Sequence, residues 1–171
     1  MVVCVPYNAF VQTNPTPPAV SCHSRCDIQS VLEVGLGDAS RCQRLMEWLF
    51  WQNPDVKLRY AAIDMFEAGG GISLKQFHST VTQQGAKPLP IPGDLITGLP
   101  RVVHTIGAVD LLILSEDIDS VSQPQIASFL ERALHESSLI FATDADEGRM
   151  YSLTHSELLS EIQQESISKA A

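Results

Sequence analysis

The sequence lacks a long hydrophobic run. Its longest apolar stretches, such as VDLLIL at 109–114, are far shorter than the roughly 20 residues that a membrane-spanning helix requires. It also lacks the pattern of a secretory signal, because the first basic residue is Arg25 and proline interrupts the apolar residues before it. We therefore expect a cytoplasmic protein that has no membrane partner.

Basic residues are few. The chain has 11 Lys and Arg against 20 Asp and Glu, a formal net charge of −9, and the basic residues are scattered. Phosphate groups repel such a chain, so nucleic acid is not a favoured partner. Hydrophobic residues make up 44% of the 171 residues, which suffices for the core of one domain.

Groups of metal ligands are sparse as well. Cys22, His23 and Cys26 lie close together, but structural zinc sites usually show a second pair of ligands and the sequence offers none. Reduced thiols, as in most cytoplasmic proteins, are the favoured interpretation.

The composition changes near residue 27. Residues 1–26 contain TNPTPP and no periodic pattern, which predicts an extended or mobile segment. Residues 27–164 alternate between short apolar runs and helical patterns, and residues 165–171 are expected to form a frayed tail. We therefore predict a single α/β domain over 27–164.

Five apolar runs are the predicted strands of this domain, and MYSL at 150–153 is a possible sixth. The five runs are 31–34, 57–64, 88–91, 108–117 and 138–144. Helical patterns separate them, and Thr154 and Glu157 form a capping box for a last helix. The pattern predicts a three-layer α/β sandwich with a mostly parallel sheet of five to six strands. Ligands of such sheets bind beyond the carboxyl ends of the strands.

The stretch VLEVGLGDAS, residues 31–40, marks the first of these strand ends. Gly35 and Gly37 permit a tight turn against which a ligand can lie closely. Glu33 and Asp38 flank the turn and would repel a pyrophosphate, whereas a cationic amine would be attracted. The sixth position of the dinucleotide fingerprint is Ser40 instead of Gly or Ala, which disfavours a nicotinamide cofactor.

The other strand ends are also rich in polar residues. Asp64 closes the second strand, where a carboxylate typically accepts hydrogen bonds from ribose hydroxyls. Asp94 follows the third strand, Ser115 and Glu116 follow the fourth, and Asp144 follows the fifth. These residues are the candidates for a ligand site.

Over roughly residues 27–144, the chain resembles a class I S-adenosylmethionine-dependent methyltransferase. The resemblance lies in four motifs: ExGxG after the first strand, an acid that closes the second, GD after the third, and VDLLIL as the fourth strand. The resemblance implies a Rossmann-like fold, S-adenosylmethionine as cofactor and S-adenosylhomocysteine as product. It also implies that Glu33 and the turn hold the methionine part, Asp64 the ribose, Asp94 and Leu95 the adenine, and that Ser115 and Glu116 face the methyl group. The implied cofactor-binding set is Glu33, Gly35, Leu36, Gly37, Asp38, Asp64, Met65, Asp94, Leu95, Ser115 and Glu116.

The chain departs from this family in its last part. The family's sheet closes with a sixth strand and an antiparallel seventh joined as a hairpin, whereas 27 residues follow position 144 here and include one short candidate strand. We expect a reduced form that lacks the hairpin. Because that region helps to shape the acceptor pocket, the methyl acceptor is unknown.

Two subclasses of the family are disfavoured. Catechol-type enzymes hold a divalent cation, for which Asp117 and Asp144 are the weak candidates, but Ala145 stands where their Asn is expected. No metal is therefore expected. No Asn-Pro-Pro-Tyr-like motif follows the fourth strand, which argues against methylation of amino groups in adenine, cytosine or glutamine.

Three functions follow, in order of preference. The first is S-adenosylmethionine binding with methyl transfer to a small or protein acceptor, with no catalytic base named, since His78 and His104 are both weak candidates. The second is a non-catalytic methyltransferase-like interaction module that binds a protein partner or a second copy, for which Trp48 and Trp51 are the candidate contacts. The third is a nicotinamide-dependent oxidoreductase.

Overall fold

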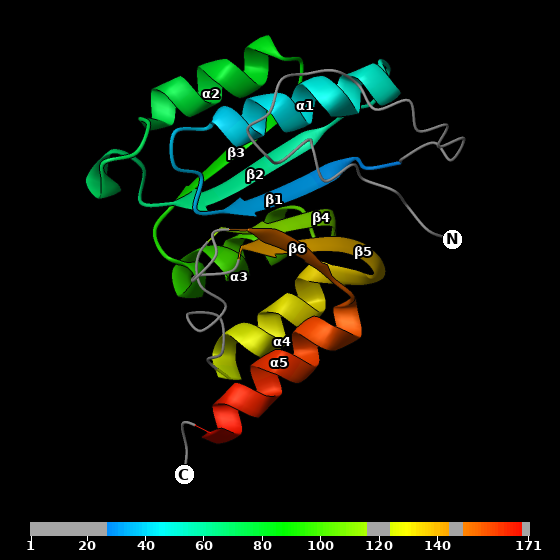
Figure 1. Cartoon of the computed structure of the whole chain (residues 1–171). Helices are drawn as coiled ribbons and strands as arrows, with labels where there is room; N and C mark the ends of the chain where they lie inside the picture. The colour runs from blue at the N-terminus through cyan, green and yellow to red at the C-terminus, as the bar shows by residue number, and fades with distance from the viewer. Residues whose placement is uncertain (1–26, 116–123, 144–148, 169–171) are drawn as a thin grey trace.

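The computed structural model describes residues 27–115, 124–143 and 149–168. Strands and helices alternate along these residues (Figure 1), with one 3₁₀ helix, η2, after the second strand. The elements are β1 (Ser30–Val34), α1 (Ser40–Gln52), β2 (Arg59–Asp64), η2 (Phe66–Gly69), α2 (Leu74–Gln83), β3 (Lys87–Pro92), α3 (Leu95–Thr105), β4 (Val109–Leu114), α4 (Pro124–Ala133), β5 (Leu134–Thr143), β6 (Met150–Leu153) and α5 (His155–Ser168).

The strands form one six-stranded sheet in the order β3-β2-β1-β4-β5-β6. Strands β1 to β5 are parallel, and β6 pairs antiparallel with β5. The chain adds strands on one side of β1 and then, from β4, on the other side, so the switch point lies between β1 and β4. The predicted mostly parallel α/β sheet is confirmed, and the run at 150–153 is its sixth strand.

Helices cover both faces of the sheet (Figure 1). Helices α1 and α2 lie on one face, and α3, α4 and α5 lie on the other. Neighbouring residues of a strand point to opposite faces, so Val31 belongs to the core under α1 and α2 while Leu32 belongs to the core under the other three helices. All five residues of β1 are buried because the strand lies in the centre of the sheet and helices cover both of its faces.

Proline distinguishes the edge strand from the central ones. Strand β3 has the sequence KPLPIP, and its three prolines cannot donate backbone hydrogen bonds. The strand lies at the end of the sheet and pairs only with β2, so one of its sides needs no donors. The weak strand predicted at 88–91 is therefore a regular edge strand.

Helix starts follow the local sequence. Ser73 and Gln76 form a capping box that opens α2. The capping box predicted for α5 is also present, because the Glu157 amide donates to Thr154 Oγ1 and the Thr154 amide donates to the Glu157 carboxylate. None of the described helices is long and apolar enough to cross a membrane.

Candidate functional site

The ends of four neighbouring strands form a continuous row. Gly35, just after β1, donates from its amide to the Ile63 carbonyl of β2 at 3.0 Å, and Ser115, just after β4, donates to the Val34 carbonyl at 3.0 Å. Gly93, just after β3, donates to the Asp64 carbonyl at 3.1 Å. Because paired strands lie about 4.8 Å apart, this row of strand ends is roughly 14 Å long. It brings together residues that are as many as 80 positions apart in the sequence.

The turn after β1 has an unusual backbone. Gly35 and Gly37 have φ angles of 75° and 61°, and Ala39, at the start of α1, also has a φ of 61°. Glycine adopts such angles without the steric cost that other residues meet. A Cβ atom added to Gly37 would meet no atom within 4 Å, so the turn faces open space at this point. Leu36, between the glycines, is buried in the core and anchors the turn.

Asp64 ties this turn to the end of β2. Its Oδ2 accepts a hydrogen bond from the Leu36 amide at 2.7 Å and a longer one from the Gly37 amide at 3.4 Å. Its Oδ1 accepts one from the Phe66 amide. A carboxylate has about four acceptor positions, so Asp64 retains capacity for a further donor such as a hydroxyl.

A glycine-rich segment closes against the same turn. A Cβ atom on Gly71 would lie 3.2 Å from the Gly37 carbonyl oxygen and 3.6 Å from Asp64 Oδ1, so only glycine fits there without displacing its neighbours. The next residue, Ile72, donates from its amide to the Gly37 carbonyl at 3.5 Å. This contact of the glycine run at residues 69–71 was not predicted from the sequence. The run of three glycines was the available signal.

Glu33 lies beneath the turn and is completely buried. Its Oε1 pairs with Arg41 Nε at 2.7 Å, and its Oε2 accepts a hydrogen bond from the Tyr60 hydroxyl at 2.5 Å. Burial raises the pKa of the Glu33 carboxyl, and the positive charge of Arg41 and the Tyr60 hydroxyl oppose that rise. Burial and the nearby Glu33 carboxylate raise the pKa of Tyr60. Both oxygens of Glu33 are thus engaged within the protein.

Arg41 and Tyr60 were not predicted as part of the site. Arg41 lies in the first turn of α1, and its Nη2 also donates to the Gly35 carbonyl at 3.1 Å. The available signal for Arg41 was a cation eight residues after a buried acid, at the start of the following helix. Tyr60 pairs with Val31 in the register of β1 and β2, which the sequence does not reveal.

The remaining predicted acids have local partners. Asp94 is the N-cap of α3 and accepts hydrogen bonds from the Thr97 hydroxyl and amide, which lower its pKa. Asp38 accepts a hydrogen bond from the Ser40 amide at 3.0 Å, which lowers its pKa. Both carboxylates are at the surface and stay ionised at neutral pH.

Apolar side chains lie beside these acids. Met65, directly after Asp64, is 52% exposed, and Ile96, in the first turn of α3, is 38% exposed. Leu95, the first residue of α3, is buried. Two exposed apolar side chains therefore follow the ends of β2 and β3, where the resemblance implies the adenine site.

Ser115 has a hydroxyl without a partner. Its Oγ is buried, and none of the described residues forms a hydrogen bond with it. An unsatisfied buried hydroxyl is uncommon and costs stability unless a ligand or water satisfies it. Of the predicted site residues, Glu116 lies outside the described residues, and so do the weak metal candidates Asp117 and Asp144 and the cluster Cys22, His23 and Cys26. The described part of the chain holds no group of three His, Cys, Asp or Glu side chains that could bind a metal ion.

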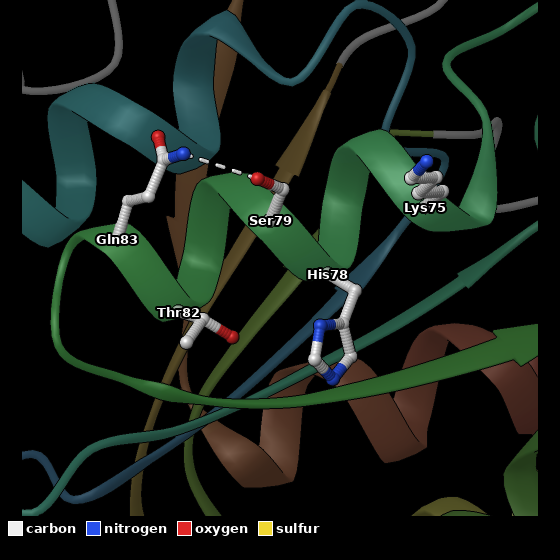
Figure 2. A pocket seen from close by; sticks show the side chains of 5 residues that line it. All are labelled: Lys75, His78, Ser79, Thr82 and Gln83. Carbon is white, nitrogen blue, oxygen red and sulfur yellow. Dashed lines mark hydrogen bonds between the residues drawn. The ribbon is translucent and has the colours of Figure 1, made fainter.

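A shallow hollow of about 400 Å³ lies elsewhere, on the outer side of α2 (Figure 2). Its lining side chains, all from this helix, are Lys75, His78, Ser79, Thr82 and Gln83, and Gln83 donates to Ser79 at 3.1 Å. None of them belongs to the predicted cofactor-binding set. His104 lies in the last turn of α3, which precedes β4, so it is near the amino end of that strand and away from the row of strand ends.

Comparison with known proteins supports the architecture. No protein-family model matches the sequence, and no curated protein sequence matches it. Among solved structures, MNMC2 from Aquifex aeolicus matches with a TM-score of 0.52 and 11% identity, over 67% of this chain and 42% of that one. The Podospora anserina methyltransferase PaMTH1, bound to S-adenosylhomocysteine, matches with a TM-score of 0.50 and 12% identity, over 83% of this chain and 62% of that one.

The present chain thus spans between two fifths and two thirds of the length of these two structures. The shared order of strands and helices is that of the methyltransferase-type Rossmann-like fold, as the sequence predicted.

Proposed function

We propose that this chain, with its methyltransferase fold, binds S-adenosylmethionine at the row of strand ends and transfers its methyl group to an acceptor. The carrying observation is the position of the glycine turn at the switch point of the sheet and of Asp64 at the end of the adjacent strand β2. The two are joined by hydrogen bonds from the Leu36 and Gly37 amides to the Asp64 carboxylate. This chain shares its fold with a methyltransferase bound to S-adenosylhomocysteine, and that likeness supports the choice of ligand.

The residues present are compatible with this cofactor. Asp64 retains acceptor capacity for the ribose hydroxyls, and the open space at Gly37 leaves room beside the turn for the methionine part. Met65 and Ile96 offer apolar surface for the adenine ring next to Asp94 and Leu95. The free Ser115 hydroxyl lies at the end of β4, toward the expected position of the methyl group. The bound cofactor would supply an electrophilic methyl group, and the protein would position it and exclude water.

Calorimetric titration with S-adenosylmethionine, S-adenosylhomocysteine and NAD tests the binding step. We expect the first two to bind and NAD not to bind. We also expect Asp64→Ala to abolish binding, because it removes the ribose acceptor and releases the glycine turn. Asp55→Ala is the matched control, since Asp55 is an exposed acid in the loop after α1 and should leave affinity unchanged. Failure of all three ligands to bind to the folded wild-type protein would contradict the proposal.

The internal partners of the acidic side chains favour a second function, that of a non-catalytic interaction module. Glu33, Asp38 and Asp94 all have partners within the protein, as they would in a domain that keeps the fold as an interaction module. The two functions differ in turnover. A methyltransferase produces S-adenosylhomocysteine when small-molecule or protein acceptors are supplied, whereas an interaction module does not. Trp51, which is 69% exposed at the end of α1, is the contact that a partner would cover.

A further inference from the structure

The buried carboxylate of Glu33 has one hydrogen-bonded partner among the described residues that is partly exposed to solvent. Glu33 itself has no exposed surface, whereas the side chain of its partner Arg41 is 20% exposed. The second partner, Tyr60, is fully buried in the core between the sheet and α2. Arg41 therefore lies between Glu33 and the surface at the mouth of the glycine turn.

The contacts of Arg41 are those that a primary ammonium group would make at this place. Its guanidinium donates from Nε to a Glu33 carboxylate oxygen at 2.7 Å and from Nη2 to the Gly35 carbonyl at 3.1 Å. Both acceptors belong to the β1 end and the turn, which are the elements expected to hold the methionine part of the cofactor. A ligand amine and the Arg41 guanidinium would compete for the same acceptors, because each is a cation that carries N–H donors.

We propose that Arg41 is a specificity-determining residue that occupies the amine position of the site and must leave Glu33 before an amine-bearing ligand is fully bound. This inference rests on the proposed function, since it concerns the same site. It also explains how Glu33 can be completely buried and still have the ligand-binding role that the family resemblance implies. Arg41 can move because its side chain is long and partly exposed, whereas Tyr60 is held on all sides.

Two ligands that differ in the amine test this competition. S-adenosylhomocysteine carries the amino-acid part, and 5′-methylthioadenosine shares the thioether-linked adenosine but lacks that part. In Arg41→Gln, we expect S-adenosylhomocysteine to bind about tenfold more tightly than in the wild type, roughly 1.4 kcal/mol, while the affinity for 5′-methylthioadenosine stays the same. Arg59→Gln, which removes an exposed positive charge at the amino end of β2, away from the row of strand ends, is the control and should change neither affinity.

Two further variants keep the test decisive if Arg41→Gln does not fold because Glu33 has lost its counter-charge. Arg41→Lys retains the charge but loses the two-pronged contact, so a smaller gain for S-adenosylhomocysteine is expected. The double variant Glu33→Gln/Arg41→Gln removes the buried charge altogether. In that variant the preference for S-adenosylhomocysteine over 5′-methylthioadenosine should fall below the wild-type preference.

The outcomes separate this inference from the proposed function. Binding by the wild type that is unchanged or weakened in the folded Arg41 variants overturns the competition but leaves the proposed function intact. Absence of binding by the wild type and by the folded Arg41 variants overturns both. Binding by the wild type that becomes tighter in the Arg41 variants for the amine-bearing ligand alone supports both. Binding of S-adenosylhomocysteine by a folded Arg41 variant but not by the wild type supports the competition and contradicts the proposed function of the wild-type chain.

Discussion

At the scale of single residues, the candidate site is a set of carboxylates with different surroundings. Asp64 lies at the end of a strand and orders the neighbouring glycine turn through two backbone amides, those of Leu36 and Gly37. Asp94 caps a helix at the surface, and Glu33 is enclosed in the core with a cation and a hydroxyl. The residue type is similar in each case, and burial together with the hydrogen-bond partners determines whether the group meets a ligand or supports the fold.

Glu33 provides a test by pH. Its pKa in the folded state is raised above the ordinary 4.5, so the folded state holds the proton more tightly than the unfolded state does. This contribution to stability is fully present below pH 4.5 and is lost as the pH rises through the folded pKa. Glu33→Gln cannot titrate and keeps an acceptor for Tyr60. The free energy of unfolding of Glu33→Gln relative to the wild type should therefore increase with pH above 4.5.

Urea unfolding of both proteins at closely spaced pH values from about 4 to 8, a range that begins below the ordinary carboxyl pKa of 4.5, measures this difference. The comparison cancels the contributions of Asp38, Asp94 and Glu157, whose lowered pKa values are common to both proteins. Parallel stability profiles would show that Glu33 titrates as an ordinary carboxyl.

At the scale of elements, the contact between α3 and the sheet depends on a missing side chain. Gly98 lies within α3, and a Cβ atom there would come within 2.8 Å of Ile63 Cγ2 on β2. Ile63 is itself buried in the core. The same glycine weakens the isolated helix, because glycine has a low helix propensity, and Pro100 two residues later weakens it further. Close packing of this helix thus outweighs its local propensity.

Gly98→Ala should therefore destabilise the protein by about 1–3 kcal/mol, the usual cost of overpacking a core, despite the better helix propensity of alanine. The double variant Gly98→Ala/Ile63→Ala removes Cγ1, Cγ2 and Cδ1 of Ile63, the atoms that a Cβ atom at position 98 would meet at 2.8–3.0 Å, so Gly98→Ala should cost less in the Ile63→Ala background than in the wild type. Chemical denaturation of the wild type, both single variants and the double variant gives the coupling energy. A stabilised Gly98→Ala protein, or additive effects of the two changes, would contradict the contact.

At the scale of the whole molecule, the candidate site exists only in the folded sheet. Its residues come from the ends of β1, β2, β3 and β4, which are adjacent in space because these four parallel strands are neighbours in one sheet, with α1 and α2 on one face and α3, α4 and α5 on the other (Figure 1). Unfolding separates all of them at once. A ligand of this site must therefore stabilise the domain as a unit.

S-adenosylhomocysteine at a hundred times its dissociation constant should raise the free energy of unfolding by about 2.7 kcal/mol. For a domain of this size, that gain corresponds to a rise in melting temperature on the order of 5–10 °C. Differential scanning calorimetry of the wild type measures the shift, and NAD at the same concentration is the control ligand. An equal shift in Asp64→Ala would mean that the ligand binds elsewhere.

Sequence reasoning located most of the architecture. The five apolar runs predicted β1 to β5, and the possible sixth run at 150–153 is β6. The buried residues of α1 are spaced as one face of a helix: Cys42, Leu45, Met46 and Leu49. These features depend on residues that are close together in the sequence and on the hydrophobicity of their side chains, so a short stretch of sequence is enough to predict them. The prediction was less accurate for β5. This strand begins at Leu134, four residues before the predicted start, and its pairing with β4 has an irregular register at Asp110.

By itself, the sequence determined the fold class, the order of strands and helices, and the set of polar residues that follow the strands, because hydrophobic periodicity and turn residues act over short distances. Only the tertiary structure decided which of those residues are available. It paired Glu33 with Arg41 and Tyr60, engaged Asp64 with the turn that precedes it by almost 30 residues, and left the Ser115 hydroxyl free. The physical reason is that burial and hydrogen-bond partners are set by contacts between distant elements. Two acids, Glu33 and Asp38, flank the turn in VLEVGLGDAS. In the folded protein the buried one, Glu33, forms an ion pair with Arg41.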